Sequence, residues 1–96
     1  MVYTNNNQVK KALVSLAIET TLLEIGKPTY DEVSHKLFKD YKCYLPDCYE
    51  HPEYLKTILK DLYGPSSAVI VNSIKNQLEE FETQTGIDIF IVGISG

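Results

Sequence analysis

The sequence contains no arginine and no tryptophan, and only two of its 96 residues are cysteine. Without arginine, the chain lacks the side chain that best recognises guanine or phosphate through paired hydrogen bonds, although a codon preference for lysine would explain the same absence. Acidic residues outnumber basic ones by thirteen to nine, so the formal net charge is −4. Nucleic-acid-binding domains usually present a basic face, and this balance argues against nucleic acid as the main partner.

Long apolar runs and phosphate-binding loops are also missing. No stretch approaches the roughly 20 apolar residues of a membrane helix, and the polar segment 1–11 opens no secretory signal. No glycine-rich phosphate loop occurs in the sequence. We therefore expect a cytoplasmic protein without membrane association, in which Cys43 and Cys48 are thiols rather than a disulfide.

The length and the apolar content favour one small domain over residues 1–96. Apolar residues make up 44% of the sequence, which is too many for a disordered tail. A chain of this size buries only about 60 to 70% of its unfolded surface, so its core is thin. Glycine and proline divide the chain into segments with helical spacing of apolar residues. The predicted helices span about 6–25, 29–42, 52–63 and 66–85.

The first predicted helix is apolar over a wide arc. Its principal stripe recurs at spacings of three and four residues, at Val9, Leu13, Leu16, Thr20 and Leu23. Further apolar residues widen this stripe, namely Ala12, Ala17, Ile18 and Leu22. A stripe this broad suggests contact on two sides, within the bundle and with a second subunit. We therefore expect a homodimer.

Local signals delimit the second and third helices. Thr29 and Glu32 have the spacing of a capping box. Pro52 suits the first position of a helix, and Gly64 suits its end. The expected inner faces of the second, third and fourth helices are Val33, Leu37, Phe38 and Tyr41, then Leu55, Ile58, Leu59 and Leu62, then Ile70, Ile74, Leu78 and Phe81.

The segment 87–96 changes character, because it is rich in β-branched residues and nearly uncharged. We interpret it as a short extended tail that must be covered by another surface. The predicted fold class is therefore all-α, a small four-helix bundle with a short extended C-terminal tail.

Residues 28–78 combine a Leu-Pro-Asp loop, a His-Pro-Glu-Tyr-Leu helix start and a Leu-Tyr-Gly stop. The most specific pieces are Glu50-His51-Pro52 and Tyr63-Gly64. This stretch, a little over half of the chain, resembles the Nitrosopumilus output domain family, fifth type. The resemblance implies an archaeal helical domain at the output end of signalling proteins, or a stand-alone chain, and it carries over no catalytic residue. The chain departs from the family pattern at residues 65–67, directly after the stop.

Tyrosines crowd the region between the second and third helices. Tyrosine has a large apolar body with a polar tip and is enriched at binding hot spots. The predicted partner-binding residues are Tyr41, Tyr44, Leu45, Tyr49 and Tyr54. The alternative is that these rings seal the loop over a thin core.

The same region holds candidate zinc ligands, Cys43, Cys48 and His51, with His35 as the available fourth ligand. Their spacing is not the one typical of zinc knuckles, and buried loop thiols are the alternative. Cys48 also precedes a helix start, a position that lowers a thiol pKa. However, no third catalytic member and no oxyanion donors can be identified, so we expect no enzyme.

We therefore predict a non-enzymatic interaction module that acts through protein contacts and self-association. One alternative is a DNA-associated regulator resembling a helix-turn-helix, which would need Lys36, Lys39, Lys42, Lys56 and Lys60 on one face. The other is a metal- or redox-responsive switch through Cys43, Cys48 and His51.

Overall fold

The protein is an all-α chain, as the sequence predicts. A computed structural model describes residues 6–81 and 86–95, and in these ranges no strand occurs. The elements are α1 (Asn6–Ile25), α2 (Lys27–Tyr41), η1 (Leu45–Tyr49), α3 (Pro52–Tyr63), η2 (Gly64–Ser66), α4 (Ser67–Gln77), η3 (Glu79–Phe81) and α5 (Ile87–Ser95), where η denotes a 3₁₀ helix.

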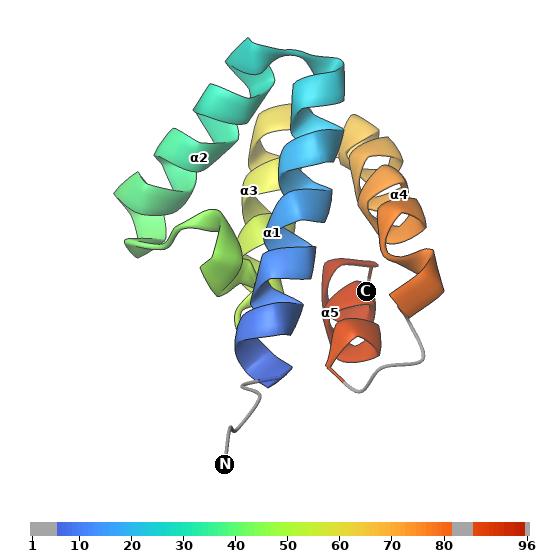
Figure 1. Cartoon of the computed structure of the whole chain (residues 1–96). Helices are drawn as coiled ribbons and strands as arrows, with labels where there is room; N and C mark the ends of the chain where they lie inside the picture. Colours follow the sequence, from blue (N-terminus) through green and yellow to red (C-terminus); the bar gives the residue numbers. More distant parts are fainter. Residues whose placement is uncertain (1–5, 82–85, 96) are drawn as a thin grey trace.

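The helices surround one core (Figure 1). In that view α1 lies in front of α3, with α2 on one side and α4 and α5 on the other. Helix α1 contacts η1, α2 and α4, and α3 contacts α2, α4 and α5. The core therefore lies between α1 and α3. Its largest fully buried side chains include Phe90, Ile18, Leu22, Leu37, Leu55, Ile58, Leu59, Ile74 and Leu78.

The side of α1 that faces the core is opposite the side that contains Val9, Leu16 and Leu23. The buried residues are Val14, Ala17, Ile18, Thr21 and Leu22. They recur at spacings of three and four, so they form one face of a helix with 3.6 residues per turn. The spacing alone could not decide between the two sides, because both sides of α1 are apolar.

Helix α2 begins at Lys27, two residues before the predicted start. Proline is tolerated in a first helical turn, so Pro28 lies inside the helix. The predicted capping box at Thr29 does not form. Instead, the Glu32 carboxylate accepts a hydrogen bond from the Tyr63 hydroxyl at 3.0 Å. A contact between α2 and α3 therefore replaces the local cap.

Helix α3 has the predicted bounds. Pro52 stands at its first position, and Gly64 follows its end with a φ of 56° that favours glycine. Helix α4 is shorter than the predicted 66–85, because it ends at Gln77. The next residue, Leu78, donates from its N–H to the carbonyls of Ile74 and Lys75, and the chain continues as η3. Residues 82–85 of the predicted helix lie outside the described residues.

The predicted extended tail is a helix. Four apolar residues of α5 are buried, namely Ile87, Phe90, Ile91 and Ile94. Their spacing of three, one and three residues places them on one helical face, which lies against α3 and α4. The Asp88 carboxylate accepts from the N–H groups of Gly86 and Ile89 at 3.1 and 2.8 Å, which supports the helix start. Burial of this stripe outweighs the preference of β-branched residues for strands.

Gly93 is the point of close approach between α5 and α3. A methyl group added there would overlap Pro52, lying 2.7 Å from its Cβ. A glycine-to-alanine change inside a helix usually stabilises by about 0.5 to 1 kcal/mol. We expect the opposite for Gly93→Ala, a loss of about 1 to 3 kcal/mol, because the overlap forces α5 away from α3. Urea unfolding followed by circular dichroism measures this change. Exposed Val92→Ala on the same helix is the control, and a more stable Gly93→Ala variant would contradict the packing.

Candidate functional site: a protein-interaction surface

The tyrosines of the central region divide into packed rings and one exposed ring. Tyr41 and Tyr54 stack with their centroids 4.1 Å apart and their planes within 1° of parallel. His51 also stacks on Tyr54, at 4.6 Å between centroids. These contacts join the end of α2 to the start of α3. Tyr41, Tyr49 and Tyr54 are partly buried against the core, and Leu45 is part of the core.

Tyr44 is the member of the predicted partner-binding set that lies on the surface, with 65% of its area exposed. Its N–H donates to the Asp47 carboxylate at 2.9 Å, and the Asp47 N–H donates back to the Tyr44 carbonyl at 3.0 Å. The Tyr44 ring lies 5.4 Å from the ring of Phe38, and the Lys42 ammonium lies 5.2 Å from the Phe38 centroid. Phe38 was predicted to face inward, but it is exposed. Phe38 and Tyr44, which we call the aromatic pair, therefore lie together at the surface.

A cleft of about 210 Å³ lies between Tyr44 and α1. The cleft lies between α1, α2 and η1, and its lining comprises Ser15, Glu19, Tyr30, Ser34, Tyr44, Leu45 and Pro46. Within the described part of the chain, the buried hydroxyl of Ser34 has no hydrogen-bond partner. Sequence reasoning did not identify this cleft, because its walls come from three segments that only the fold brings together.

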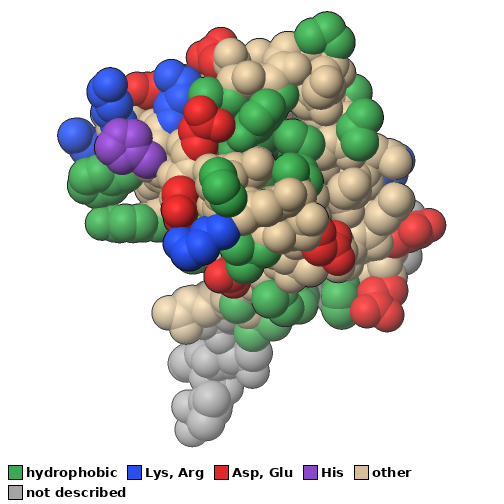
Figure 2. All heavy atoms as spheres, turned by 90° about the horizontal axis from the view of Figure 1, so that it is seen from above, with side chains coloured by type: hydrophobic (Ala, Val, Ile, Leu, Met, Phe, Trp, Pro, Cys, Tyr) green, Lys and Arg blue, Asp and Glu red, His purple; other side chains and the backbone are tan. Residues whose placement is uncertain are grey.

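The outward side of α1, which we call the outer face of α1, consists of Val9, Ala12, Leu16 and Leu23. Val9, Leu16 and Leu23 are 50, 59 and 44% exposed. Leu16 lies two residues from both Val14 and Ile18 in the core, a rotation of about 200° around the helix. The outer face is therefore opposite the core. Seen from above, the molecule shows hydrophobic side chains beside acidic and basic ones (Figure 2).

Burial governs the chemistry of Cys48. The side chain is 1% exposed, and desolvation raises the pKa of its thiol from 9.0 to about 12. The expected lowering of this pKa by the following helix start was therefore wrong, because loss of hydration dominates. Cys43 is partly buried, and burial raises the pKa of its thiol as well. Both cysteines are free thiols in this structure.

The predicted zinc ligands do not assemble into a metal centre. Among the described residues, no three His, Cys, Asp or Glu side chains are placed to hold a metal ion. The Cys43 thiol instead donates to the Tyr41 carbonyl at 3.4 Å, and the His51 ring lies 3.4 Å from the Glu53 carboxylate. His35 is exposed on α2.

The lysines that a DNA-binding face would require are divided between two places. Lys56 and Lys60 line a cavity together with residues of α4 and α5. Lys36 and Lys39 lie on α2 and Lys42 directly follows it, and none of these three lines that cavity. The five lysines named for a DNA-binding face therefore do not all line one cavity.

Comparison with known proteins gives no match, whether to a family, to a curated protein or to a solved structure. The likeness to the Nitrosopumilus output domain family therefore stays a prediction. Within the described residues, no helix is both long enough and apolar enough to cross a membrane.

The two thiols should differ in reactivity. At pH 8 we expect a thiol reagent to modify Cys43 in the folded protein, and Cys48 to react only after denaturation, because Cys48 is buried and protonated. Mass spectrometry of the labelled protein before and after denaturation measures this difference. Equal labelling of both cysteines in the folded state would contradict the burial of Cys48.

The raised pKa of Cys48 also predicts a pH dependence of stability. Above pH 9 the thiol ionises in the unfolded chain but stays protonated in the folded one until about pH 12. The contribution of Cys48 to the free energy of unfolding is therefore fully present below pH 9. It is lost as the pH rises toward 12. We expect the wild type to lose more unfolding free energy over this range than Cys48→Ala. Parallel losses in urea titrations of the two proteins would refute this.

Proposed function

We propose that this chain is a non-enzymatic interaction module that pairs with a second copy of itself through the outer face of α1. The observation that carries the proposal is the exposure of Val9, Leu16 and Leu23 at seven-residue intervals on one side of α1. We further propose that the module acts at the output end of archaeal signal transduction. That part rests on the resemblance of residues 28–78 to the Nitrosopumilus output domain family, fifth type.

The outer face suits a second copy because it is self-complementary. In an antiparallel pair related by a two-fold axis at Leu16, Val9 of one helix lies opposite Leu23 of the other, and Leu16 meets its own equivalent. A two-fold interface requires this reciprocity, in which the same patch serves both subunits. A repeat of seven residues also keeps the apolar side chains along the seam between two helices.

The charges along α1 favour the antiparallel direction. Lys10 and Lys11 lie in its N-terminal half, and Glu19 and Glu24 lie in its C-terminal half. Antiparallel pairing brings the basic half of each helix alongside the acidic half of the other. Parallel pairing would bring like charges together, which is unfavourable.

The cleft beside α1 gives such an interface a polar margin. Glu19 belongs to both α1 and the cleft lining, and Tyr44 forms another part of that lining. A second copy on the outer face would therefore lie close to the aromatic pair. Exposed aromatic rings at the edge of an apolar patch are common in protein interfaces. The buried, protonated thiol of Cys48 further supports a role without nucleophilic catalysis.

Leu16→Glu tests the proposal. The substitution places two carboxylates opposite each other at the two-fold axis, so we expect the dimer dissociation constant to rise by about a hundredfold or more, close to 2.7 kcal/mol. Sedimentation equilibrium over a wide concentration range measures it. Val69→Glu is the matched control, because Val69 is 69% exposed on α4 and lies outside α1. We expect Val69→Glu to leave the constant unchanged.

Two results would reject self-association through this face. One is a wild-type protein that sediments as a monomer at the highest concentration. The other is equal weakening by Leu16→Glu and Val69→Glu, which would assign the effect to net charge. Circular dichroism of both variants checks that the helical fold is retained.

A further inference from the structure

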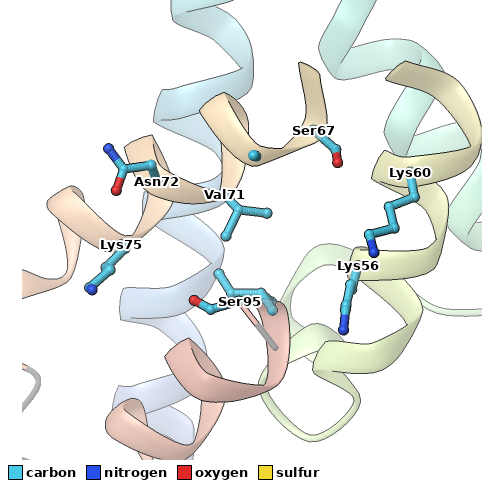
Figure 3. Close-up of a pocket in the computed structure, with 9 residues that line it drawn as sticks. Lys56, Lys60, Ser67, Val71, Asn72, Lys75 and Ser95 are labelled. Atoms are coloured by element: carbon cyan, nitrogen blue, oxygen red, sulfur yellow. The ribbon is translucent and has the colours of Figure 1, made fainter. Parts of the chain in front are cut away.

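A cavity of about 430 Å³ opens between α3, α4 and the end of α5 (Figure 3). Lys56 and Lys60 extend along one wall from α3. Asn72 and Lys75 belong to α4 on the opposite wall, and Ser95 at the end of α5 lies between the two walls. The volume is within the usual range of small-molecule sites, roughly 300 to 1,000 Å³. Helix α1 does not line this cavity, so the site is separate from the proposed dimer face.

The cavity concentrates positive charge in a chain whose net charge is −4. None of its three lysines forms an ion pair with any carboxylate in the described ranges, whereas Lys11, Lys27 and Lys36 each do. Lys56 and Lys60 are also one helical turn apart on the same side of α3, an arrangement in which like charges repel. An anion between the walls would remove this repulsion.

We propose that this cavity binds a small molecule that carries one or two phosphoryl groups. Each phosphoryl group has a charge of about −1.5 to −2 at pH 7, so two of them balance three lysines and one balances at least half of that charge. A single carboxylate carries one negative charge and would balance only one lysine. Lysine is a common phosphate ligand because its ammonium acts as a compact point charge.

Neutral donors complete the site. The Asn72 amide and the Ser67 hydroxyl belong to the lining and can donate to phosphate oxygens. The Ser95 hydroxyl already donates to the Ile91 carbonyl at 2.7 Å, so it does not add a donor. The competing interpretation is that the lysines serve the end of α5, since the last carbonyl groups of a helix attract cations. Only a phosphate site predicts a response to added phosphate.

A titration of the ¹⁵N-labelled protein with pyrophosphate at constant ionic strength tests the proposal by nuclear magnetic resonance. We expect saturable shifts of the amide signals of Ser67, Ala68 and Asn72, which border the cavity. Inorganic phosphate should bind more weakly than pyrophosphate, since it carries less charge. Citrate is the comparison anion, because its charge resides on carboxylates, and it should also bind more weakly than pyrophosphate.

The double variant Lys56→Gln, Lys60→Gln should weaken pyrophosphate binding by about tenfold or more. Its matched control is Lys27→Gln, Lys39→Gln, which makes the same change in net charge on α2 and should weaken binding by less than about twofold. If the first variant does not fold, Lys75→Gln alone tests the opposite wall, with an expected weakening of about three- to tenfold.

Three results would overturn the proposal. Equal weakening in the two double variants would show that only net charge matters. Citrate binding as tightly as pyrophosphate would reject the preference for phosphate. An absence of saturable shifts, combined with a lower melting temperature of Lys56→Gln, Lys60→Gln, would assign the lysines to the end of α5.

Discussion

A helix can turn only one side toward a single core, but α1 has apolar residues on two opposite sides. This constraint determines how the rest of the chain is used. The side that contains Val14, Ile18 and Leu22 packs on the other helices, so Leu16 and its neighbours remain at the surface. An apolar stripe with a regular repeat exposed to water is unfavourable unless another surface covers it. The proposed self-association would cover this stripe without requiring a change in the fold.

Helix α5 completes the core that α1 begins to cover. Among the residues that the structure describes, Phe90 is the largest fully buried side chain, and it belongs to this short helix. The absence of a side chain at Gly93 lets α5 lie directly against Pro52 of α3. The same placement positions the end of α5 between the lysines of α3 and α4. Core closure and the shape of the lysine cavity therefore have one cause.

The sequence allowed prediction of what depends on local signals. Helix α3 was predicted with the right bounds because Pro52 and Gly64 act on the backbone within one turn. The predicted start of α2 was two residues late because Pro28 lies inside the first turn. The predicted capping box failed because Glu32 bonds to Tyr63, a residue distant in sequence. The prediction of an extended tail was wrong because it followed the strand propensity of the β-branched residues. The helical spacing of Ile87, Phe90 and Ile94 indicated the observed helix. Spacing is the stronger signal where a face is buried.

The candidate sites were predictable to a lesser extent. Tyr44 could be named because it lies in a tyrosine-rich loop, but nothing local distinguishes it from Tyr41, which stacks on Tyr54 instead. The lysine cavity could not be anticipated, because Lys60 of α3 and Lys75 of α4 come to line one cavity only after the two helices have packed. The depressed pKa expected for Cys48 also failed for a tertiary reason, its complete burial.

The stacked rings of Tyr41, Tyr54 and His51 have an optical consequence. Since the chain contains no tryptophan, its near-ultraviolet absorption and emission come chiefly from tyrosine. Two parallel phenol rings with centroids 4.1 Å apart hold a fixed mutual geometry, so their near-ultraviolet circular dichroism depends on the junction between α2 and α3. The protein thus carries an intrinsic spectroscopic probe at that junction, which makes its local loosening observable without any attached label.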